Sequence, residues 1–444
     1  MIRITYRRAS CRFILTAGFV CLLAAKSPAS TPRGGGAGKA RTAQHPSRRR
    51  AAAASSTSVQ AKPFGRLALT PPMGWNSWNH FAGHVTARVL RQTADAMVAS
   101  GMKAAGYRYV VVDDTWLAHH RDARGRLQPN PRRFAGGIQA LAAYIHKRGL
   151  KFGIYEDAGL QTCAKYPGSL GHYRQDARTF AGWGVDYLKF DWCNVPFKRF
   201  PGLTPAQVAH RLYRRMHQAL LATGRPIVFS LCEWGLYTPW RWAGEDGNLW
   251  RTTGDINDTW ARMSAIGFHQ NAIAGYARAG HWNDPDMLEV GNGGMTPTEY
   301  RTHMSLWAML AAPLMAGNDL RHMPAATLQI LTNRDVIAVD QDRLGIEGHR
   351  IWRSARPRKG QPASDQEIWV KPLAGGSEAV GLFNRDTAPV TIRLHLWQIG
   401  MRAPACVRDL WMHRNQVIRS ASLARQVAGH GVVMLRVGPH AECN

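Results

Sequence analysis

The feature that most restricts the fold of this 444-residue chain is a regular alternation of short apolar runs with amphipathic stretches, which begins at about residue 67. This alternation is typical of parallel strands joined by crossover helices. Four runs are well marked, at residues 109–112, 151–155, 187–190 and 226–231, and four are weaker, at residues 73–78, 249–252, 279–283 and 306–310. Eight such strands predict an α/β fold, a (β/α)8 TIM barrel over residues 64–345.

Two of the stretches between these runs contain specific helix signals. The first has one apolar face, made of Leu90, Ala94, Met97 and Val98, and ends at Gly101. The second opens with a Thr204-Pro-Ala-Gln207 capping box, and its apolar face consists of Val208, Leu212, Met216 and Leu220. A doubly wound open sheet shows the same alternation, but no Gly-x-Gly-x-x-Gly motif follows the first strand, which favours the barrel.

After Gly345 the sequence changes to short alternating segments separated by turn residues. Four of these segments are residues 367–371, 379–383, 390–394 and 431–436. Period-two alternation predicts an antiparallel β domain over residues 346–444. Because this region contains no cluster of acids or metal ligands, we expect it to pack against the barrel and stabilise it rather than to bind sugar.

The N-terminus has the pattern of an export signal. Arg3, Arg7, Arg8 and Arg12 precede an apolar run at residues 14–25, so residues 1–30 are predicted to be a signal peptide rather than a buried N-terminal helix. Residues 31–63 lack acidic residues and hydrophobic periodicity and are predicted to be a disordered basic linker. We therefore expect an exported protein, extracellular or periplasmic. No other stretch approaches the roughly 18 apolar residues of a membrane span.

The charge balance does not by itself identify a partner. The chain has 57 basic and 29 acidic residues, a formal net charge of +28. A nucleic-acid binder would be expected to show a zinc spacing, an RNA-recognition signature or a basic recognition helix, and none is present. We therefore predict no nucleic-acid partner and interpret the excess charge as a basic tail and surface.

Five cysteines follow the predicted signal peptide, which would remove Cys11 and Cys21. They are Cys163, Cys193, Cys232, Cys406 and Cys443. Because five is odd, at least one is free, and an exported protein can pair the other four.

Reactive side chains of a (β/α)8 barrel lie at the C-terminal ends of its strands. Those positions here hold many acids together with tryptophan, lysine and arginine, in the segments Asp113-Asp114, Tyr155-Glu-Asp157, Lys189-Phe-Asp191, Cys232-Glu-Trp234, Arg251-Thr-Thr-Gly-Asp255 and Trp282-Asn-Asp-Pro-Asp-Met287. Convergent carboxylates with flat apolar faces suit a polyhydroxylated sugar and its hydrolysis. Metal binding by Asp113 and Asp114 is the alternative, but no suitable ligand spacing supports it. We predict no metal and no cofactor.

Read together, these segments resemble glycoside hydrolase family 27, the α-galactosidases and α-N-acetylgalactosaminidases. The motifs are Met73-Gly-Trp-Asn-Ser-Trp78, Val112-Asp-Asp114, Lys189-Phe-Asp-Trp-Cys193, Ser230-Leu-Cys-Glu-Trp-Gly235, Trp250-Arg-Thr-Thr-Gly-Asp255 and Trp282-Asn-Asp-Pro-Asp-Met-Leu288. The resemblance implies a barrel with a C-terminal β-sandwich and a retaining mechanism without metal.

The resemblance also implies a role for each matching residue. Asp191 would be the nucleophile, and Lys189, two positions earlier on the same strand face, would keep it ionised. Asp255 would be the acid/base, and Arg251 would bind near O2 of the sugar. The rest of the sugar site would consist of Trp75 as an aromatic platform, Asp113 and Asp114 on O4 and O6, and Tyr155, Cys232, Trp234, Asp286 and Met287.

The family also places a disulfide beside the nucleophile, which implies a bridge between Cys163 and Cys193. A bridge between Cys406 and Cys443 is left open. The chain departs from the common pattern at Glu156 and Tyr173, which puts leaving-group specificity in doubt.

Three functions compatible with the resemblance are hydrolysis of terminal α-D-galactosides, hydrolysis of a related glycoside (N-acetyl-α-galactosaminide or β-L-arabinopyranoside), and sugar binding without catalysis. The presence of both catalytic aspartates argues against the last. Asp113 and Asp114 suit a substrate with a hydroxymethyl group, which a pentopyranoside lacks. By resemblance, Leu236 and Tyr237 would crowd an N-acetyl group. We therefore expect an α-galactosidase whose partner is a carbohydrate, the α-galactoside substrate.

Overall fold

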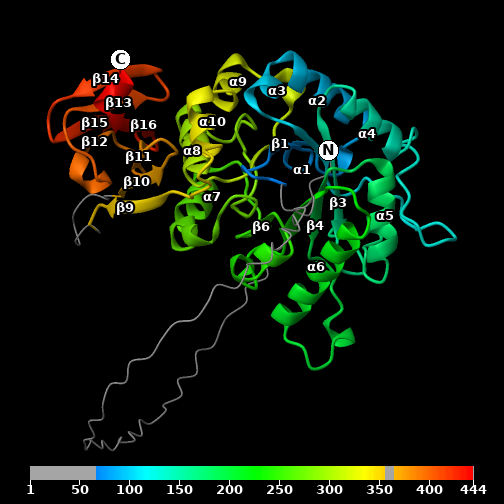
Figure 1. The fold of residues 1–444 in the computed structure, drawn as a ribbon. Coiled ribbons are helices and arrows are strands. Elements are labelled where there is room, and N and C mark those ends of the chain that lie inside the picture. Colours follow the sequence, from blue (N-terminus) through cyan, green and yellow to red (C-terminus); the bar gives the residue numbers. More distant parts are fainter. Residues whose placement is uncertain (1–66, 356–364, 444) are drawn as a thin grey trace, which may run out of the picture. The chain divides into compact units, whose positions relative to one another are not determined.

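The computed structural model describes residues 67–355 and 365–443. Its main feature is a parallel eight-stranded sheet in the order β7-β6-β5-β4-β3-β2-β1-β8 (Figure 1). The strands are β1 (Met73–Asn76), β2 (Tyr109–Val112), β3 (Lys151–Asp157), β4 (Tyr187–Asp191), β5 (Val228–Cys232), β6 (Leu249–Arg251), β7 (Trp282–Asp284) and β8 (Leu314–Ala316). Leu288, shortly after β7, donates its backbone N–H to the carbonyl oxygen of Met315 in β8, which closes the ring. The predicted (β/α)8 barrel is confirmed.

Helices connect successive strands and lie around them in Figure 1. The longer ones are α2 (Ala87–Ala99), α4 (Ile138–His146), α5 (Tyr173–Trp183), α6 (Pro205–Leu221), α7 (Trp260–Gly267) and α8 (Pro297–Met309). The shorter ones are α1 (Trp78–Phe81), α3 (Met102–Ala105), α9 (Ala325–Leu331) and α10 (Arg334–Asp340). Their apolar faces cover the outer surface of the barrel, and side chains of the strands themselves fill its interior.

The helix signals of the sequence are confirmed with one exception. Thr204 and Gln207 form the capping box of α6, and all four predicted core residues of this helix are buried. In α2, Leu90, Ala94 and Met97 are fully buried, but Val98 is 42% exposed. Val98 follows Met97 by one residue, which turns its side chain about 100° around the helix and away from the core.

The predicted strand at residues 306–310 is wrong, because this run is the end of α8. A capping box of Thr296 and Glu299, with Pro297 in the first turn, starts that helix. The run is apolar on all sides because α8 contacts strands of the C-terminal sheet, and a helix buried on every side loses its amphipathic period. The eighth strand follows at β8.

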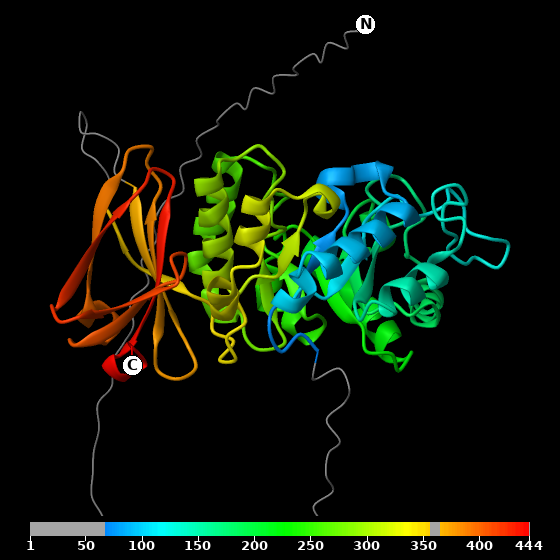
Figure 2. The same ribbon diagram turned by 90° about the horizontal axis from the view of Figure 1, so that it is seen from above.

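The C-terminal region is an antiparallel β-sandwich, drawn in orange and red in Figure 2. Its larger sheet has the order β14-β13-β16-β11-β10-β9, and β12 pairs with β15 in a second sheet. The strands are β9 (His349–Arg353), β10 (Gln366–Pro372), β11 (Glu378–Asn384), β12 (Val390–His395), β13 (Ala405–Asp409), β14 (Arg414–Ile418), β15 (Ser422–Val427) and β16 (Val432–Pro439). Side chains of both sheets, such as Leu382 and Ile392, form one core.

Four of these strands, β9, β13, β14 and β15, were not recognised in the sequence. The outer strands β9 and β14 are polar and largely exposed, so they lack the alternation that marks a half-buried strand. The larger sheet also packs against the barrel: Phe268 meets the rings of Trp369 and Phe383 edge-on, with centroids 6.2 and 5.3 Å apart. These contacts agree with the stabilising role expected of this domain.

The predicted signal peptide and basic linker, residues 1–63, lie outside the described residues. Among the helices that are described, none has both the length and the apolar character needed to cross a membrane.

Candidate active site

The C-terminal ends of the barrel strands surround a pocket of about 510 Å³. Most of the residues expected at a sugar site line it. These are Asp113, Asp114, Tyr155, Lys189, Asp191, Trp234, Arg251, Asp255, Asp286 and Met287. They come from segments up to 174 positions apart, counting from Asp113 to Met287, so the barrel is what brings them together.

Asp191 ends β4 at the floor of the pocket and is 5% exposed. Its Oδ2 accepts a hydrogen bond from the Tyr155 hydroxyl at 3.0 Å, and its Oδ1 accepts one from the backbone N–H of Trp192 at 3.0 Å. Lys189 lies two residues earlier on the same strand, but its Nζ pairs directly with Asp113 Oδ2 at 2.8 Å. The lysine therefore acts on Asp191 through its electric field rather than through a direct ion pair.

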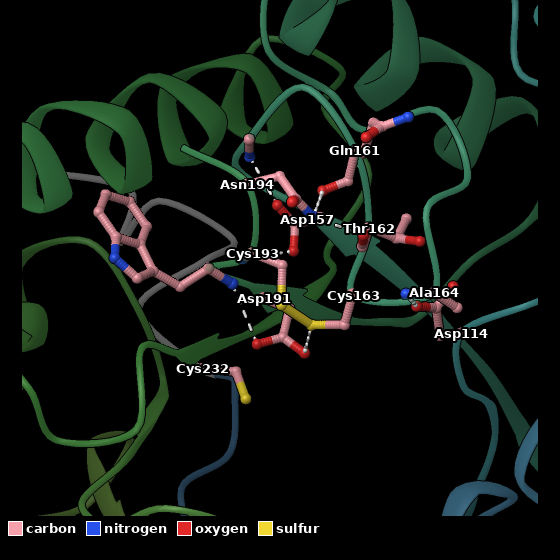
Figure 3. Close-up of a disulfide and its surroundings, with 12 residues drawn as sticks. Asp114, Asp157, Gln161, Thr162, Cys163, Ala164, Asp191, Cys193, Asn194 and Cys232 are labelled. Atoms are coloured by element: carbon pink, nitrogen blue, oxygen red, sulfur yellow. Dashed lines mark hydrogen bonds between the residues drawn. A yellow bond between two sulfur atoms is a disulfide. The ribbon is translucent and has the colours of Figure 1, made fainter. Parts of the chain in front are cut away.

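A disulfide joins Cys163 and Cys193 beside this carboxylate (Figure 3). The two Cα atoms are 5.1 Å apart, and the sulfur of Cys163 lies 3.5 Å from Asp191 Oδ2. Asp157, on β3, accepts the backbone N–H of Cys193 at 2.8 Å, which ties the two strand ends together. The bridge is the one that the resemblance implied. Cys406 and Cys443 form the second bridge, which leaves Cys232 as the free cysteine among the described residues.

Asp255 lines the same pocket but is far more exposed than Asp191. Its side chain is 71% exposed, and its Oδ1 lies 3.0 Å from Arg251 Nη2. The same Nη2 lies 3.0 Å from Asp286 Oδ2, so the buried guanidinium bridges two carboxylates. Arg251 is thus fixed between the acid/base candidate and the pocket wall.

The two aspartates have opposite pKa shifts in this substrate-free state. Burial raises the pKa of Asp191 to about 6, although the charge of Lys189 partly offsets this effect. Desolvation also acts to raise the pKa of Asp255, but the charges of Arg251 and Lys189 outweigh it and bring the pKa below its usual range. In the substrate-free state Asp191 is therefore the more basic of the two carboxylates.

Two residues expected to contact sugar lie beneath the pocket instead. Trp75 is fully buried, and its indole N–H donates to the carbonyl oxygen of Asn318 at 2.8 Å, so it has no exposed face to serve as a platform. Cys232 is 1% exposed and borders a small cavity of about 30 Å³ that shares Lys189, Arg251 and Asp286 with the pocket wall. Cys232 ends β5 in register with Asp191, but its side chain is buried, so neither residue contacts the pocket.

Glu156 and Tyr173, the two positions at which the sequence departs from the common family pattern, do not line the pocket. Glu156 alternates with Tyr155 along β3, so it points behind the strand, where it accepts a hydrogen bond from Ser169 Oγ at 3.1 Å. The hydroxyl of Tyr173 donates to the carbonyl oxygen of Ala158 at 2.6 Å. Neither residue lines the pocket, and the expected effect on leaving-group specificity has no geometric basis.

Leu236 also lies outside the lining. It is 58% exposed on the loop after β5, and its backbone N–H donates to the carbonyl oxygen of Glu233 at 3.1 Å. Tyr237 donates its backbone N–H to the Glu233 carboxylate at 2.8 Å. Discrimination against an N-acetyl group by this loop therefore stays a prediction.

One group in the described part of the chain could in principle hold a metal ion. Potential ligand atoms of Asp157, Cys163, Asp191 and Cys193 lie within 4.8 Å of one another. However, both sulfurs belong to the disulfide and cannot act as thiolates, which are the sulfur form that binds metal. The two remaining carboxylates do not complete a cage.

Sequence reasoning missed the outer rim of the pocket. The rim residues are Trp78, Asn79, His80, Asp258, Glu289 and Asn292. They follow β1, β6 and β7, so the strand-end rule could have found them, but their polar side chains resemble those of ordinary surface loops.

The same chain was compared with known proteins. A family model described as alpha galactosidase A matches residues 70–342, and one described as the alpha galactosidase C-terminal beta sandwich domain matches residues 363–437. The chain is 47% identical to the alpha-galactosidase of Cyamopsis tetragonoloba over 378 residues, which covers 84% of this chain and 88% of that protein.

Solved structures with the same fold include two from different enzymes. Alpha-galactosidase I from Mortierella vinacea has a TM-score of 0.79 and 35% identity, with 84% of this chain and 98% of that chain covered. A GH27 β-L-arabinopyranosidase from Geobacillus stearothermophilus has a TM-score of 0.74 and 27% identity, with 84% and 97% covered.

Proposed function

The chain belongs to the α-galactosidase A family, and on this premise we propose that it is a retaining exo-glycosidase that hydrolyses terminal α-D-galactosyl residues. The observation that supports this most directly is the pair Asp191 and Asp255, which line one pocket from its buried and its exposed side. A pair of carboxyl groups that flank the glycosidic bond is what glycoside hydrolysis requires, and retention is what the resemblance to the family implies.

In the first step, a carboxylate oxygen of Asp191 attacks the anomeric carbon while Asp255 gives its proton to the glycosidic oxygen. The bond to the leaving group breaks, and a galactosyl ester of Asp191 forms. In the second step, Asp255 takes a proton from water, whose oxygen attacks the same carbon and releases Asp191. The Tyr155 hydroxyl and the Trp192 N–H orient the nucleophile throughout.

In the substrate-free state Asp191 is the more basic of the two carboxylates, whereas the first step needs the proton on Asp255. The reactive species is the singly protonated pair, and kcat/KM follows the macroscopic titration of the pair whichever aspartate holds the proton. With the pKa of Asp191 at about 6, we expect kcat/KM to fall as the pH rises above that value.

The preference for galactose rests on Asp113 and Asp114. Both are nearly fully buried, and Lys189 and Asn76 hold Asp113 in place at 2.8 and 2.7 Å. A C6 hydroxyl can donate a further hydrogen bond to these buried carboxylates, whereas a pentopyranoside has no hydroxymethyl group to offer one. A separate expectation concerns the C2 substituent: because Leu236 and Tyr237 by resemblance crowd an N-acetyl group, we expect at least a hundredfold preference for α-galactoside over its N-acetyl counterpart, on the order of 3 kcal/mol.

The test is a panel of nitrophenyl glycosides ranked by kcat/KM: α-galactoside, N-acetyl-α-galactosaminide and β-L-arabinopyranoside. We expect α-galactoside to rank first, with α-galactose as the first product seen by NMR. Comparable kcat/KM values for α-galactoside and its N-acetyl counterpart would contradict the proposed discrimination between substituents at C2. If none of the three substrates is hydrolysed, the proposed activity is wrong and sugar binding without catalysis is the remaining function.

We further propose that the protein is exported. The basic and apolar N-terminal segment supports this, and so do two disulfides, which persist in oxidising compartments. Cell fractionation with mass analysis of the mature N-terminus tests the proposal, and an unprocessed protein in the reducing cytoplasm would contradict it.

A further inference from the structure

The acid/base candidate depends on its loop for its position. The side chain of Asp255 is 71% exposed, and its carboxylate pairs with Arg251 at 3.0 Å. An exposed side chain is positioned mainly by the backbone that carries it, and proton transfer requires hydrogen-bond distance to the glycosidic oxygen. Residues 255–260 lead from Asp255 to the first residue of α7, and we call this segment the acid/base loop. The contacts that hold the loop therefore bear on catalysis.

The first part of the acid/base loop is anchored within the barrel. Ile256 donates its backbone N–H to Asp286 Oδ2 at 2.8 Å. Asp258, in the middle of the loop, accepts the Tyr300 hydroxyl at 2.7 Å. Because Tyr300 lies in the first turn of α8, this helix holds the middle of the loop.

The end of the acid/base loop contacts the C-terminal sandwich. Trp260 ends the loop and begins α7, and its indole stacks on the imidazole of His430, with ring centroids 4.2 Å apart and an angle of 14° between the ring planes. His430 belongs to the sandwich, in the turn between β15 and β16. Both α7 and α8 lie on the side of the barrel that faces the sandwich (Figure 1). One end of the loop is therefore held from outside the barrel.

The same histidine also contacts the first turn of α8. Its Nδ1 lies 2.7 Å from Oε1 of Glu299, the capping-box residue of that helix. Burial acts to raise the pKa of Glu299, but the hydrogen bonds that its carboxylate accepts outweigh this effect and bring the pKa below its usual range. An ionised carboxylate can only accept, so Nδ1 donates. Tyr300, which bonds to Asp258, follows Glu299 directly, so His430 contacts both segments that hold the loop.

The turn of the sandwich keeps His430 in an unusual backbone conformation. Its φ is 52°, in the left-handed region that few residues with a Cβ adopt. Its backbone N–H donates to the carbonyl oxygen of Asp386 at 2.9 Å, and its own carbonyl oxygen accepts the hydroxyl of Thr302 in α8 at 2.7 Å. At Gly429, directly before it, a Cβ would lie 1.9 Å from the carbonyl oxygen of Thr387. Such a conformation persists where surrounding contacts enforce it, and it is frequent at functional positions.

We propose that His430 is a positioning residue for the acid/base Asp255, because it holds the acid/base loop through Trp260 and Glu299. The C-terminal sandwich thereby contributes to proton transfer as well as to stability. His430 does not line the pocket, so it acts through the loop rather than on the substrate. This inference rests on the proposed α-galactosidase activity.

The test compares two substrates that differ in their need for a proton. Phenyl α-galactoside releases phenol, whose oxygen needs a proton as the bond breaks, whereas α-galactosyl fluoride releases fluoride ion, which leaves without that assistance. His430→Asn removes the aromatic ring but suits the left-handed backbone. Because general acid catalysis contributes on the order of 10²–10⁴-fold, we expect a misplaced Asp255 to lower kcat/KM for phenyl α-galactoside by about tenfold or more. The value for the fluoride should stay within about twofold of wild type, because its release does not use the acid.

Two variants of Trp260 test the same contact from the side of the loop. Trp260→Phe keeps an aromatic ring against His430 and should retain wild-type kcat/KM on both substrates, whereas Trp260→Ala should show the same selective loss as His430→Asn. His395→Asn is the matched control, because the ring of this histidine lies 6.2 Å from that of Trp397 within the sandwich. It should leave both substrates unchanged.

The comparison of the two substrates separates positioning from folding. Partial unfolding lowers both kcat/KM values by the same factor, so it cannot produce a selective loss on phenyl α-galactoside. An equal loss on both substrates in His430→Asn and Trp260→Ala would show that the contact serves stability alone, and no loss on either would show that the loop is positioned without it. Each of these results would overturn the proposal. Wild-type protein that hydrolyses neither substrate would refute the proposed activity instead.

Discussion

Replacement of Lys189 by methionine tests the charge arrangement of the pocket floor. The Lys189 side chain is 16% exposed, and its ammonium lies 2.8 Å from the buried Asp113 Oδ2, which also accepts from Asn76 Nδ2 at 2.7 Å. Methionine has a similar length and fills similar space, but it removes the charge and the donor. Asp113 would then be a buried carboxylate with only the Asn76 amide as a side-chain partner.

The size of the effect follows from the contact. At 2.8 Å and an effective dielectric constant of about 20, the gross attraction is about 6 kcal/mol. Removal of one member of a buried pair costs about 3–5 kcal/mol. Because Asn76 still donates to Asp113, we expect a loss near the lower end, about 3 kcal/mol in the free energy of unfolding. For a folded region of this size, that lowers Tm by about 4 °C.

Urea unfolding of the wild type, Lys189→Met, Asp113→Asn and the double variant measures this coupling. The double variant should lose less than the sum of the two single changes, because neither charge is then left alone. Lys151→Met is the matched control: this lysine is exposed at the start of the neighbouring strand β3, and its loss should change stability by about 0.5 kcal/mol at most.

The same variant has a kinetic readout that a purely structural role would not produce. Lys189 lowers the pKa of Asp191, so its removal should raise that pKa above about 6. The alkaline limb of the kcat/KM profile should move to higher pH while the maximum falls. A variant with an unfolding free energy within 1 kcal/mol of wild type and an unshifted limb would refute the reasoning.

Three further predictions concern the nucleophile, the disulfide and a buried acid. Asp191→Ala should abolish turnover while leaving the fold and sugar binding intact, and substantial residual kcat would refute its role. Cys163→Ser with Cys193→Ser should lower the unfolding free energy in urea by about 3–4 kcal/mol, since the bridge closes a 30-residue separation, and unchanged stability would contradict this. Burial raises the pKa of Glu233 from 4.5 to about 8, so its stabilising contribution is complete below about pH 4.5 and is lost as the pH rises through about 8. Thermal melts across this window should show a smaller decline for Glu233→Gln than for wild type, and equal slopes would exclude Glu233 as the cause.

Local sequence patterns predicted a structural feature correctly where the interactions that produce it lie within a few residues of one another. The capping box at Thr204 and Gln207 defined the start of α6, because both hydrogen bonds form within four residues. The position of Lys189 two residues before Asp191 placed both on one face of β4, because side chains alternate along a strand. The apolar runs located seven of the eight barrel strands. The rule that reactive side chains lie at the C-terminal ends of barrel strands located most of the residues that line the pocket.

The sequence by itself thus determined the barrel, the identity of the strand-end residues and the two candidate catalytic aspartates. Only the tertiary structure decided which atoms are partners. Lys189 pairs with a carboxylate 76 residues away, Asn79 donates to Glu289 across 210 residues, and the buried Trp75 donates to the carbonyl oxygen of Asn318, 243 residues away. The opposite pKa shifts of Asp191 and Asp255 have the same origin. Burial and the distances between charges depend on how the whole ring of strands closes, and no local pattern specifies that closure.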